Sequence, residues 1–231
     1  MKKIITILLV AVMSISIIAC GNDATEKIES DSNKETTQAA TSVKDGKSIV
    51  IYFSYADNTD IKDVHSEDYD DLSSASITMV GGERQGNNKV IADMVAEETK
   101  ADIFSIVMED KYTSDYDKVA DIGKKENDDN IRPKLSSKLD NLNEYQNVYF
   151  VYPIWWYDFP MAVKSFFEEY DFAGKNIYPI FTSGGSGESG TVDQIKEYEP
   201  KATVYETPLE VYQRDVANAH DDVKKWLGDI K

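Results

Sequence analysis

The sequence predicts an α/β fold: a doubly wound domain built on a five-stranded parallel sheet. Three observations support this prediction. Apolar, β-rich runs recur from Ser48 onward, helical patterns alternate with them, and the runs are apolar almost without interruption. A strand that helices cover on both faces has this continuous apolarity, whereas a strand with one face in water alternates apolar and polar residues. Alternating strands and helices of this kind form one parallel sheet.

The elements follow in order along the chain. The predicted strands are SIVIYFS (48–54), ADIFSIV (101–107), NVYFVYP (147–153), NIYPIFTS (176–183) and ATVYETP (202–208). Between the first two strands, residues 89–100 predict a helix, with Val90, Ile91, Met94 and Val95 on one apolar stripe. The segment MAVKSFFEEY also predicts a helix. The last helix is amphipathic, with its apolar face formed by Val216, Ala219, Val223, Trp226, Leu227 and Ile230.

Two segments precede this domain, which we place at 48–231. Residues 1–19 combine Lys2 and Lys3 with an apolar run that is short for a transmembrane helix, although a retained helix is the alternative. Cys20 follows between small residues, and this pattern resembles the bacterial lipoprotein signal. The resemblance implies a signal peptide at 1–19 and a lipid on Cys20. Residues 20–47 predict a flexible linker because they contain too few apolar residues to fold. We expect an exported domain, anchored to the cell membrane outside the cytoplasm.

The composition excludes several classes of function. The formal net charge is −17, so the surface repels phosphate backbones and we expect no nucleic-acid partner. Cys20 is the only cysteine, which excludes an intrachain disulfide and cysteine-based metal sites. The stretch 57–71 is rich in carboxylates and contains His65, but it lacks the ligand spacing of a calcium loop. We predict a solvated acidic loop there and no metal site.

The first unusual loop joins the first strand to the helix that follows. Ser54 ends the strand and Gly86-Asn87-Asn88 opens the helix, with a predicted small hairpin (SASITMVGGER) in the insertion between them. A strand-to-helix turn offers free backbone N–H groups and the positive end of a helix dipole, which suits a phosphate. The alternative is that Asn87 only caps the helix.

Two further loops follow the third and fourth strands. The stretch YPIWWYDFP (152–160) holds Pro153, Ile154, Trp155, Trp156 and Tyr157, whose rings suit stacking on a planar ligand. The alternatives are a hydrophobic start of a helix and an exposed protein-binding patch, and we expect at least one tryptophan to pack inward. The other loop, FTSGGSGESGT, contains Thr182, Ser183, Gly184, Gly185 and Gly187. Its glycines let backbone amides approach a ligand, unless the loop is only a flexible connection.

The carboxyl ends of parallel strands share one edge of the sheet, so these loops should form one site. A phosphate cradle, stacked aromatic rings and a glycine loop together suit FMN. From Ser48 onward the chain resembles a flavodoxin-like domain of the subgroup with YP-x-WW-x-x-x-P and T-x-GGSG loops. The resemblance implies the strand order 2-1-3-4-5. It places the FMN phosphate on Ser54, Gly86, Asn87 and Asn88, and the isoalloxazine on 153–157 and 182–187.

The first loop departs from the compact S-x-T-G-N-T motif of that family. Residues 55–85 separate Ser54 from Gly86, and Asn88 stands where the motif has threonine. An alternative alignment places Asp57-Asn58-Thr59 in the phosphate loop.

The resemblance implies an FMN-binding lipoprotein that carries out electron transfer with an unidentified redox partner. An acidic shell and aromatic ring faces disfavour the electron-rich reduced flavin, and no catalytic residue is predicted. The alternatives are an NAD(P)H-dependent FMN quinone or nitro reductase, or a flavin-binding lipoprotein without redox turnover. The acidic run 109–130 predicts a solvated helix with its flanks. Docking of a basic redox partner is the other interpretation of that run.

Overall fold

The computed structural model describes residues 46–60 and 76–230. The predicted signal peptide, Cys20, nearly all of the linker and His65 lie outside these residues. Among the described helices, none combines the length and the apolarity needed to cross a bilayer.

The central sheet is parallel and has the predicted order. β1 (Ser48–Phe53) lies between β4 (Asp102–Ile106) and β5 (Asn147–Pro153), and β6 (Asn176–Ser183) pairs with the other side of β5. Numbered as predicted, this is the order 2-1-3-4, with the last strand beside β6. The predicted fold class is therefore confirmed.

The predicted fifth strand is broken into two short pieces. β7 (Thr203–Val204) pairs with the first residues of β6, and β8 (Leu209–Tyr212) pairs with its last four. The prediction of one strand over 202–208 is wrong, because residues 205–208 join the two pieces without strand structure. Pro208 has no N–H to donate to a ladder, which favours a break at this position.

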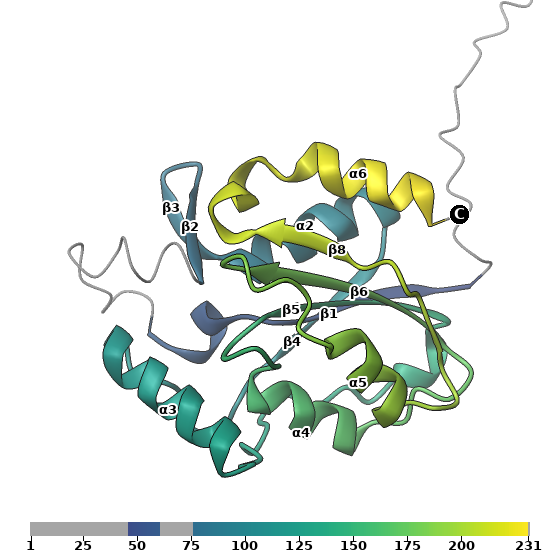
Figure 1. Cartoon of the computed structure of the whole chain (residues 1–231). Helices are drawn as coiled ribbons and strands as arrows, with labels where there is room; N and C mark the ends of the chain where they lie inside the picture. The colour runs from purple at the N-terminus through teal and green to yellow at the C-terminus, as the bar shows by residue number, and fades with distance from the viewer. Residues whose placement is uncertain (1–45, 61–75, 231) are drawn as a thin grey trace, which may run out of the picture. The chain divides into compact units, whose positions relative to one another are not determined.

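Helices cover both faces of the sheet (Figure 1). One face carries α2 (Asn87–Thr99) and α6 (His220–Asp229). The other carries α3 (Tyr116–Asp128), α4 (Met161–Glu169) and α5 (Thr191–Tyr198). Short 3-10 helices lie at η1 (Tyr55–Asn58), η3 (Leu142–Glu144) and η4 (Gln213–Asn218).

The predicted apolar faces of the first and last helices are buried. In α2, Val90, Ile91 and Val95 are buried, and Met94 is partly buried against the same cluster. The C-terminal prediction needs one correction. Val216 is buried but belongs to η4, and the helix begins at His220. The burial pattern of that segment is as predicted, although it is two elements rather than one.

Two hydrophobic clusters explain why the strands are apolar without alternation. Along β5, Val148, Phe150 and Tyr152 pack into the cluster beneath α3, α4 and α5. The intervening Tyr149 and Val151 pack into the cluster beneath α2 and α6. Both faces of β5 are thus in contact with apolar side chains, as the sequence pattern predicts.

The insertion after β1 contains the predicted hairpin. β2 (Ile77–Val80) and β3 (Glu83–Gly86) are antiparallel, and the turn residues Gly81 and Gly82 both have positive φ, at 61° and 84°. Two-residue hairpin turns of this handedness match the twist of the strands and favour glycine. The hairpin delivers the chain directly to the first residue of α2.

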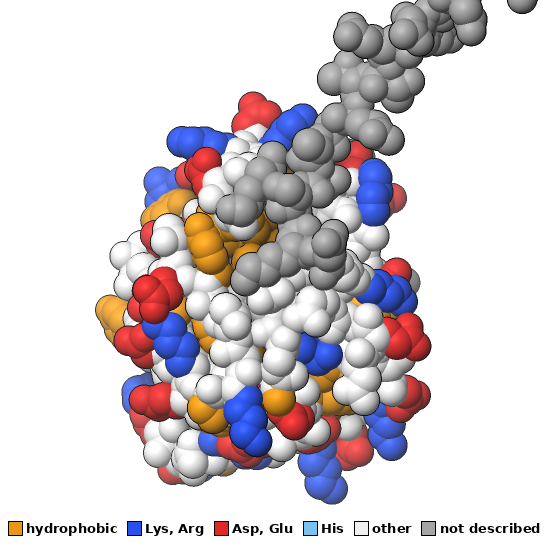
Figure 2. Space-filling model, turned by 90° about the vertical axis from the view of Figure 1, so that its right-hand side faces the viewer, with side chains coloured by type: hydrophobic (Ala, Val, Ile, Leu, Met, Phe, Trp, Pro, Cys, Tyr) orange, Lys and Arg blue, Asp and Glu red, His pale blue; other side chains and the backbone are white. Residues whose placement is uncertain are grey.

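The arrows of β6 and β8 point to the left edge in Figure 1, where their carboxyl ends lie. Figure 2 views the opposite edge. Acidic and basic side chains are mixed on that face, so the net negative charge of the chain does not gather there.

Candidate functional site

Hydrogen bonds tie the three predicted loops together at the carboxyl edge of the sheet. The side-chain amide of Asn88 donates to the Phe53 carbonyl at 3.0 Å, and the Thr182 hydroxyl donates to Asn88 Oδ1 at 2.8 Å. The Ile154 N–H donates to the Thr182 carbonyl at 2.9 Å. The loops after β1, β5 and β6 therefore share one site. The side chains of Asn88 and Thr182 hold that site together, so their hydrogen-bonding groups are already engaged.

Ser54 and Asn87 provide unused polar atoms in the strand-to-helix turn. Both residues are about 1% exposed, and Ser54 Oγ, Asn87 Nδ2 and Asn87 Oδ1 have no hydrogen-bond partner in the described structure. Buried polar atoms in this state are rare, since each costs about 1–3 kcal/mol. They lie at the N-terminus of α2, where the helix dipole favours an anion. The residues present therefore fit a phosphate group.

The alternative role of Asn87 as a helix cap is wrong. Gly86 is the N-cap residue of α2, and it has no side chain with which to cap the helix. The Asn87 N–H instead donates to the Ser76 carbonyl at 2.8 Å. Gly86 itself is required by close packing, because a Cβ there would lie 1.9 Å from Ser54 Oγ and 2.9 Å from the Ala56 side chain.

The alternative phosphate loop, Asp57-Asn58-Thr59, is engaged in internal bonds. The Asn58 amide donates to the carbonyls of Ser54 and Ile106, both at 2.9 Å, and Asn58 Oδ1 accepts the Met108 N–H at 2.8 Å. The Thr59 hydroxyl donates to a backbone carbonyl, and Asp57 accepts two hydroxyls. These bonds join η1 to the end of β4. The alignment through Ser54, Gly86 and Asn87 fits the structure better.

The aromatic stretch forms a tight turn with unusual backbone angles. Trp155 and Asp158 exchange two backbone hydrogen bonds of 2.9 Å, and Trp156 and Tyr157 between them have φ of 51° and 61°. Left-handed backbone costs a residue with a side chain about 1–2 kcal/mol. The surrounding structure must supply the interactions that hold this turn.

Asp158 supplies several of these interactions. Its carboxylate forms an ion pair of 2.6 Å with Lys164 on α4, and the two side chains are only 17% and 11% exposed. It also accepts hydrogen bonds from the Gln194 amide on α5 at 3.1 Å and from the Phe159 N–H at 2.7 Å. Asp158 thus ties the turn to two helices. The sequence analysis did not identify it, although a carboxylate at the end of an aromatic run was a usable signal.

The structure separates the three neighbouring aromatic residues. Trp155 packs inward, with its ring centroid 5.6–6.4 Å from those of Phe53, Tyr55 and Tyr112. Trp156 is 48% exposed and donates its ring N–H to the Ala120 carbonyl at 3.1 Å, while Tyr157 is 74% exposed. The expectation that at least one tryptophan packs inward is confirmed.

A cavity of about 580 Å³ lies between the aromatic turn and the glycine loop. Ile154, Trp156 and Tyr157 line one side, and Gly184, Gly185 and Ser186 line the other. Gly185 has φ of 111°, and its N–H donates to Ser183 Oγ, which donates to Glu210 on β8. Two of the predicted ring loops therefore border one open cavity. Pro153, Thr182 and Ser183 are buried and do not line the cavity, and Gly187 lies in the glycine loop with φ of 66°.

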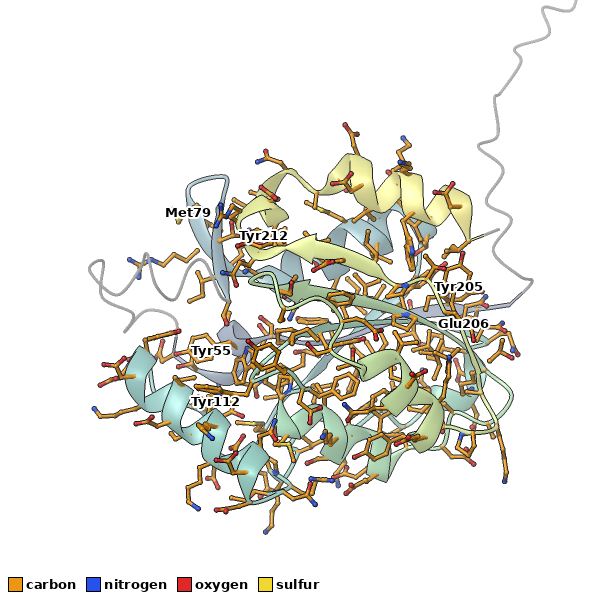
Figure 3. All side chains as sticks on the ribbon, in the orientation of Figure 1. Tyr55, Met79, Tyr112, Tyr205, Glu206 and Tyr212 are labelled. Atoms are coloured by element: carbon orange, nitrogen blue, oxygen red, sulfur yellow. The ribbon has the colours of Figure 1, made fainter. Side chains whose placement is uncertain are left out.

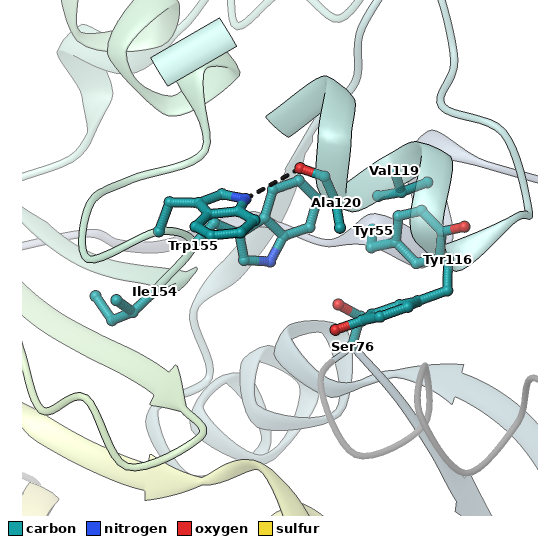
Figure 4. Close-up of a pocket in the computed structure, with 8 residues that line it drawn as sticks. Tyr55, Ser76, Tyr116, Val119, Ala120, Ile154 and Trp155 are labelled. Atoms are coloured by element: carbon teal, nitrogen blue, oxygen red, sulfur yellow. Dashed lines mark hydrogen bonds between the residues drawn. The ribbon is translucent and has the colours of Figure 1, made fainter. Parts of the chain in front are cut away.

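A second, smaller cavity of about 180 Å³ adjoins the first and shares Ile154 and Trp156 with it. Its other walls include Tyr55, Tyr116 and Trp155, as Figure 4 shows. The sequence analysis missed Tyr55 and Tyr116. The second belongs to α3, and an aromatic residue inside the acidic run 109–130 was the available signal.

Three buried tyrosines, Tyr55, Tyr112 and Tyr152, belong to the hydrophobic cluster on one face of the sheet. Tyr55 and Tyr112 lie on the side of the sheet that α3 covers (Figure 3). Burial raises the pKa of the Tyr112 hydroxyl, which donates to Glu126 at 2.8 Å, and burial also raises the pKa of the Glu126 carboxyl. The Tyr152 hydroxyl shares a hydrogen bond of 3.0 Å with Thr191 Oγ1, and burial raises the pKa of the Tyr152 hydroxyl as well. Tyr112 and Tyr152 therefore stay neutral and make hydrogen bonds inside the cluster.

Comparison with known proteins identifies a family for the domain. Residues 82–230 match the family model described as Flavodoxin. The matched range contains Gly86, Asn87 and the two ring loops, while Ser54 lies outside it. No curated protein matches the sequence.

Solved structures share the fold. A protein provisionally described as a flavoprotein from Bacteroides uniformis ATCC 8492 is 26% identical with a TM-score of 0.57, over 80% of this chain and 99% of that one. A similarly described protein from Bacteroides eggerthii DSM 20697 is 22% identical with a TM-score of 0.57, over 80% and 98%. A flavoprotein from Lactobacillus acidophilus NCFM in complex with FMN is 18% identical with a TM-score of 0.51, over 79% and 99%.

Proposed function

Because the chain belongs to the flavodoxin family, we propose that its domain binds FMN at the carboxyl edge of the sheet and carries out electron transfer. The predicted flavodoxin-like domain is confirmed by this membership. FMN as the cofactor is supported by the family and by the FMN complex of the Lactobacillus flavoprotein. We further propose that the domain is held at the outer face of the cell membrane by a lipid on Cys20.

The observation that carries FMN binding is the set of unpartnered buried atoms on Ser54 and Asn87. A phosphate accepts hydrogen bonds from a hydroxyl and an amide N–H, and bonds to a charged group are worth about 1.5–3 kcal/mol each. The 580 Å³ cavity between the aromatic turn and the glycine loop has room for a large planar ring. Bound FMN supplies the redox chemistry, since flavins accept and release electrons.

The residues of the chain bind and orient the cofactor in this proposal. Ser54 and Asn87 hold the phosphate, Trp156 and Tyr157 offer ring faces, and Asp158 keeps the turn in place. The exposure of Trp156 and Tyr157 leaves the ring cavity open to solvent, so a redox partner can approach it. A reductase is the second candidate, because the smaller cavity beside the first provides a separate space for a substrate.

FMN titration of the full chain in mild detergent tests this proposal. We expect Ser54→Ala to weaken FMN binding by about tenfold or more, since the hydrogen bond to a charged phosphate is worth at least about 1.4 kcal/mol. Riboflavin, which lacks the phosphate, should bind the parent and the variant equally. The free energy of unfolding of the Ser54→Ala apoprotein should equal or exceed that of the parent apoprotein, because the substitution removes an unpaired buried hydroxyl. Equal FMN affinity for both proteins would show that Ser54 does not contact the phosphate.

NAD(P)H distinguishes the two candidates. The FMN-loaded electron-transfer protein should not oxidise NADH or NADPH in the steady state, even with a quinone present. Sustained turnover would favour the reductase.

The lipid anchor requires its own test. We expect Cys20→Ala to abolish lipid labelling and to release the domain from the membrane fraction, because Cys20 provides the only thiol of the chain. Radiolabelled fatty acid and fractionation measure this. Ser16→Ala, a change in the apolar run, is the matched control and should keep both properties. Unchanged labelling of Cys20→Ala would contradict the proposal.

A further inference from the structure

We infer that the 180 Å³ cavity binds a neutral, electron-poor aromatic molecule of a single ring that carries an acceptor oxygen, as nitroarenes and benzoquinones do. The volume of the cavity fits a ligand of one ring. An engineered apolar cavity of about 150 Å³ accepts benzene, and this cavity is slightly larger. The three fused rings of a flavin need more space, which the neighbouring 580 Å³ cavity has.

The walls favour an aromatic ligand. Rings of Tyr55, Tyr116, Trp155 and Trp156 surround the cavity, and Val119 and Ile154 add aliphatic surface. Tyrosine and tryptophan have electron-rich ring faces, which attract the face of an electron-poor ring or the positive edge of any ring. In Figure 4, Tyr116 of α3 lies across the cavity from Ile154 and Trp155. A flat molecule therefore contacts rings from two different elements.

Two hydroxyls remain to bind an acceptor oxygen. The Tyr55 hydroxyl donates to the Thr113 carbonyl at 2.7 Å, and the Trp156 ring N–H donates to the Ala120 carbonyl at 3.1 Å, so both donors are engaged. The side chains of Ser76 and Tyr116 also line the cavity, and neither makes a hydrogen bond in the described part of the chain. A carbonyl or nitro oxygen can accept from them. An anionic ligand is disfavoured because the chain carries a net charge of −17.

The position of the cavity indicates its use. Ile154 and Trp156 line both cavities, so a molecule in the smaller one lies against the wall of the larger one. This step rests on the proposed function, in which the larger cavity holds the flavin ring. The smaller cavity is then an electron-acceptor site beside that ring.

Nitrobenzene is the probe for this site, and nitrocyclohexane, which has the same polar group without an aromatic ring, is the matched ligand. Ligand-observed NMR titration measures binding of each molecule to the full chain in detergent, with and without FMN. We expect saturable binding of nitrobenzene and at least tenfold weaker binding of nitrocyclohexane. Binding should persist in the presence of FMN.

Two variants locate the binding. Ala120→Leu fills the cavity from α3, and Tyr116→Leu removes an exposed ring and its hydroxyl. Each should weaken nitrobenzene binding at least tenfold while FMN affinity and the melting temperature stay near those of the parent. Ala217→Leu, on the exposed surface of η4, is the control and should change nothing.

The outcomes separate the two proposals. Equal nitrobenzene binding to the parent and to both cavity variants overturns the inference, as does competition between nitrobenzene and FMN. A chain that fails to bind FMN but binds nitrobenzene in an Ala120-dependent manner keeps the cavity assignment and contradicts the proposed function.

Discussion

Replacement of Trp155 by alanine should lower the free energy of unfolding by about 3–5 kcal/mol, as truncation of a large packed aromatic side chain does. Its ring lies among Phe53, Tyr55 and Tyr112, and a Cβ at Gly123 of α3 would be in van der Waals contact with the Trp155 ring at 3.4 Å. The variant leaves a cavity where the aromatic turn, β1 and α3 meet. Urea denaturation of the apoprotein, followed by far-UV circular dichroism, measures the loss.

Tyr157→Ala is the matched control, two residues away in the same turn. Tyr157 is 74% exposed, so its removal should change stability by no more than about 0.5 kcal/mol. It should instead weaken FMN binding, because Tyr157 lines the ring cavity. Similar losses of stability in the two variants would contradict the inward packing of Trp155.

Replacement of Asp158 by alanine should cost about 3–5 kcal/mol of stability, because it leaves the charge of Lys164 buried and unpaired. Lys164 is only 11% exposed and has its ion pair with Asp158 at 2.6 Å. The turn also loses its bonds to Gln194 and to the Phe159 N–H. Chemical denaturation measures the stability, and FMN titration measures the effect on the site.

A double variant separates the charge from the positioning role. Asp158→Ala with Lys164→Met removes both charges and should recover most of the stability. FMN affinity should stay low in the double variant, because Trp156 and Tyr157 still lack the anchor of their left-handed backbone. Asp158 is a positioning residue only if the two effects separate in this way. Full recovery of FMN affinity in the double variant would contradict that role.

Much of the fold could be predicted because a strand that is buried on both faces has an almost continuously apolar sequence. Residues 147–153 and 176–183 are strands over the predicted bounds, since both faces of each are buried. The fifth strand could not be predicted as two pieces. Tyr205 and Glu206 continue the β-rich pattern, and only the position of Pro208 relative to β6 shows where pairing stops.

The loops of the site could be predicted, but the use of each side chain could not. Asn88 and Thr182 are 94 residues apart in sequence and pair with each other, and no local pattern indicates such a contact. Asn58 is likewise engaged by Ile106 and Met108 of the neighbouring strand and the residues after it. An asparagine side chain can hydrogen-bond either to a ligand or to the protein itself. Only the neighbours in space show that Asn88 is bonded within the protein whereas Asn87 has unpartnered atoms.

The break between β7 and β8 affects how copies of the chain meet one another. A continuous strand at the border of a sheet exposes a row of N–H and C=O groups on which another chain can add a strand, and such borders promote aggregation. Here that border consists of two residues and then four, separated by a segment that contains Pro208. Neither piece is long enough to template a stable intermolecular ladder. This interruption keeps neighbouring molecules from joining their sheets at this border.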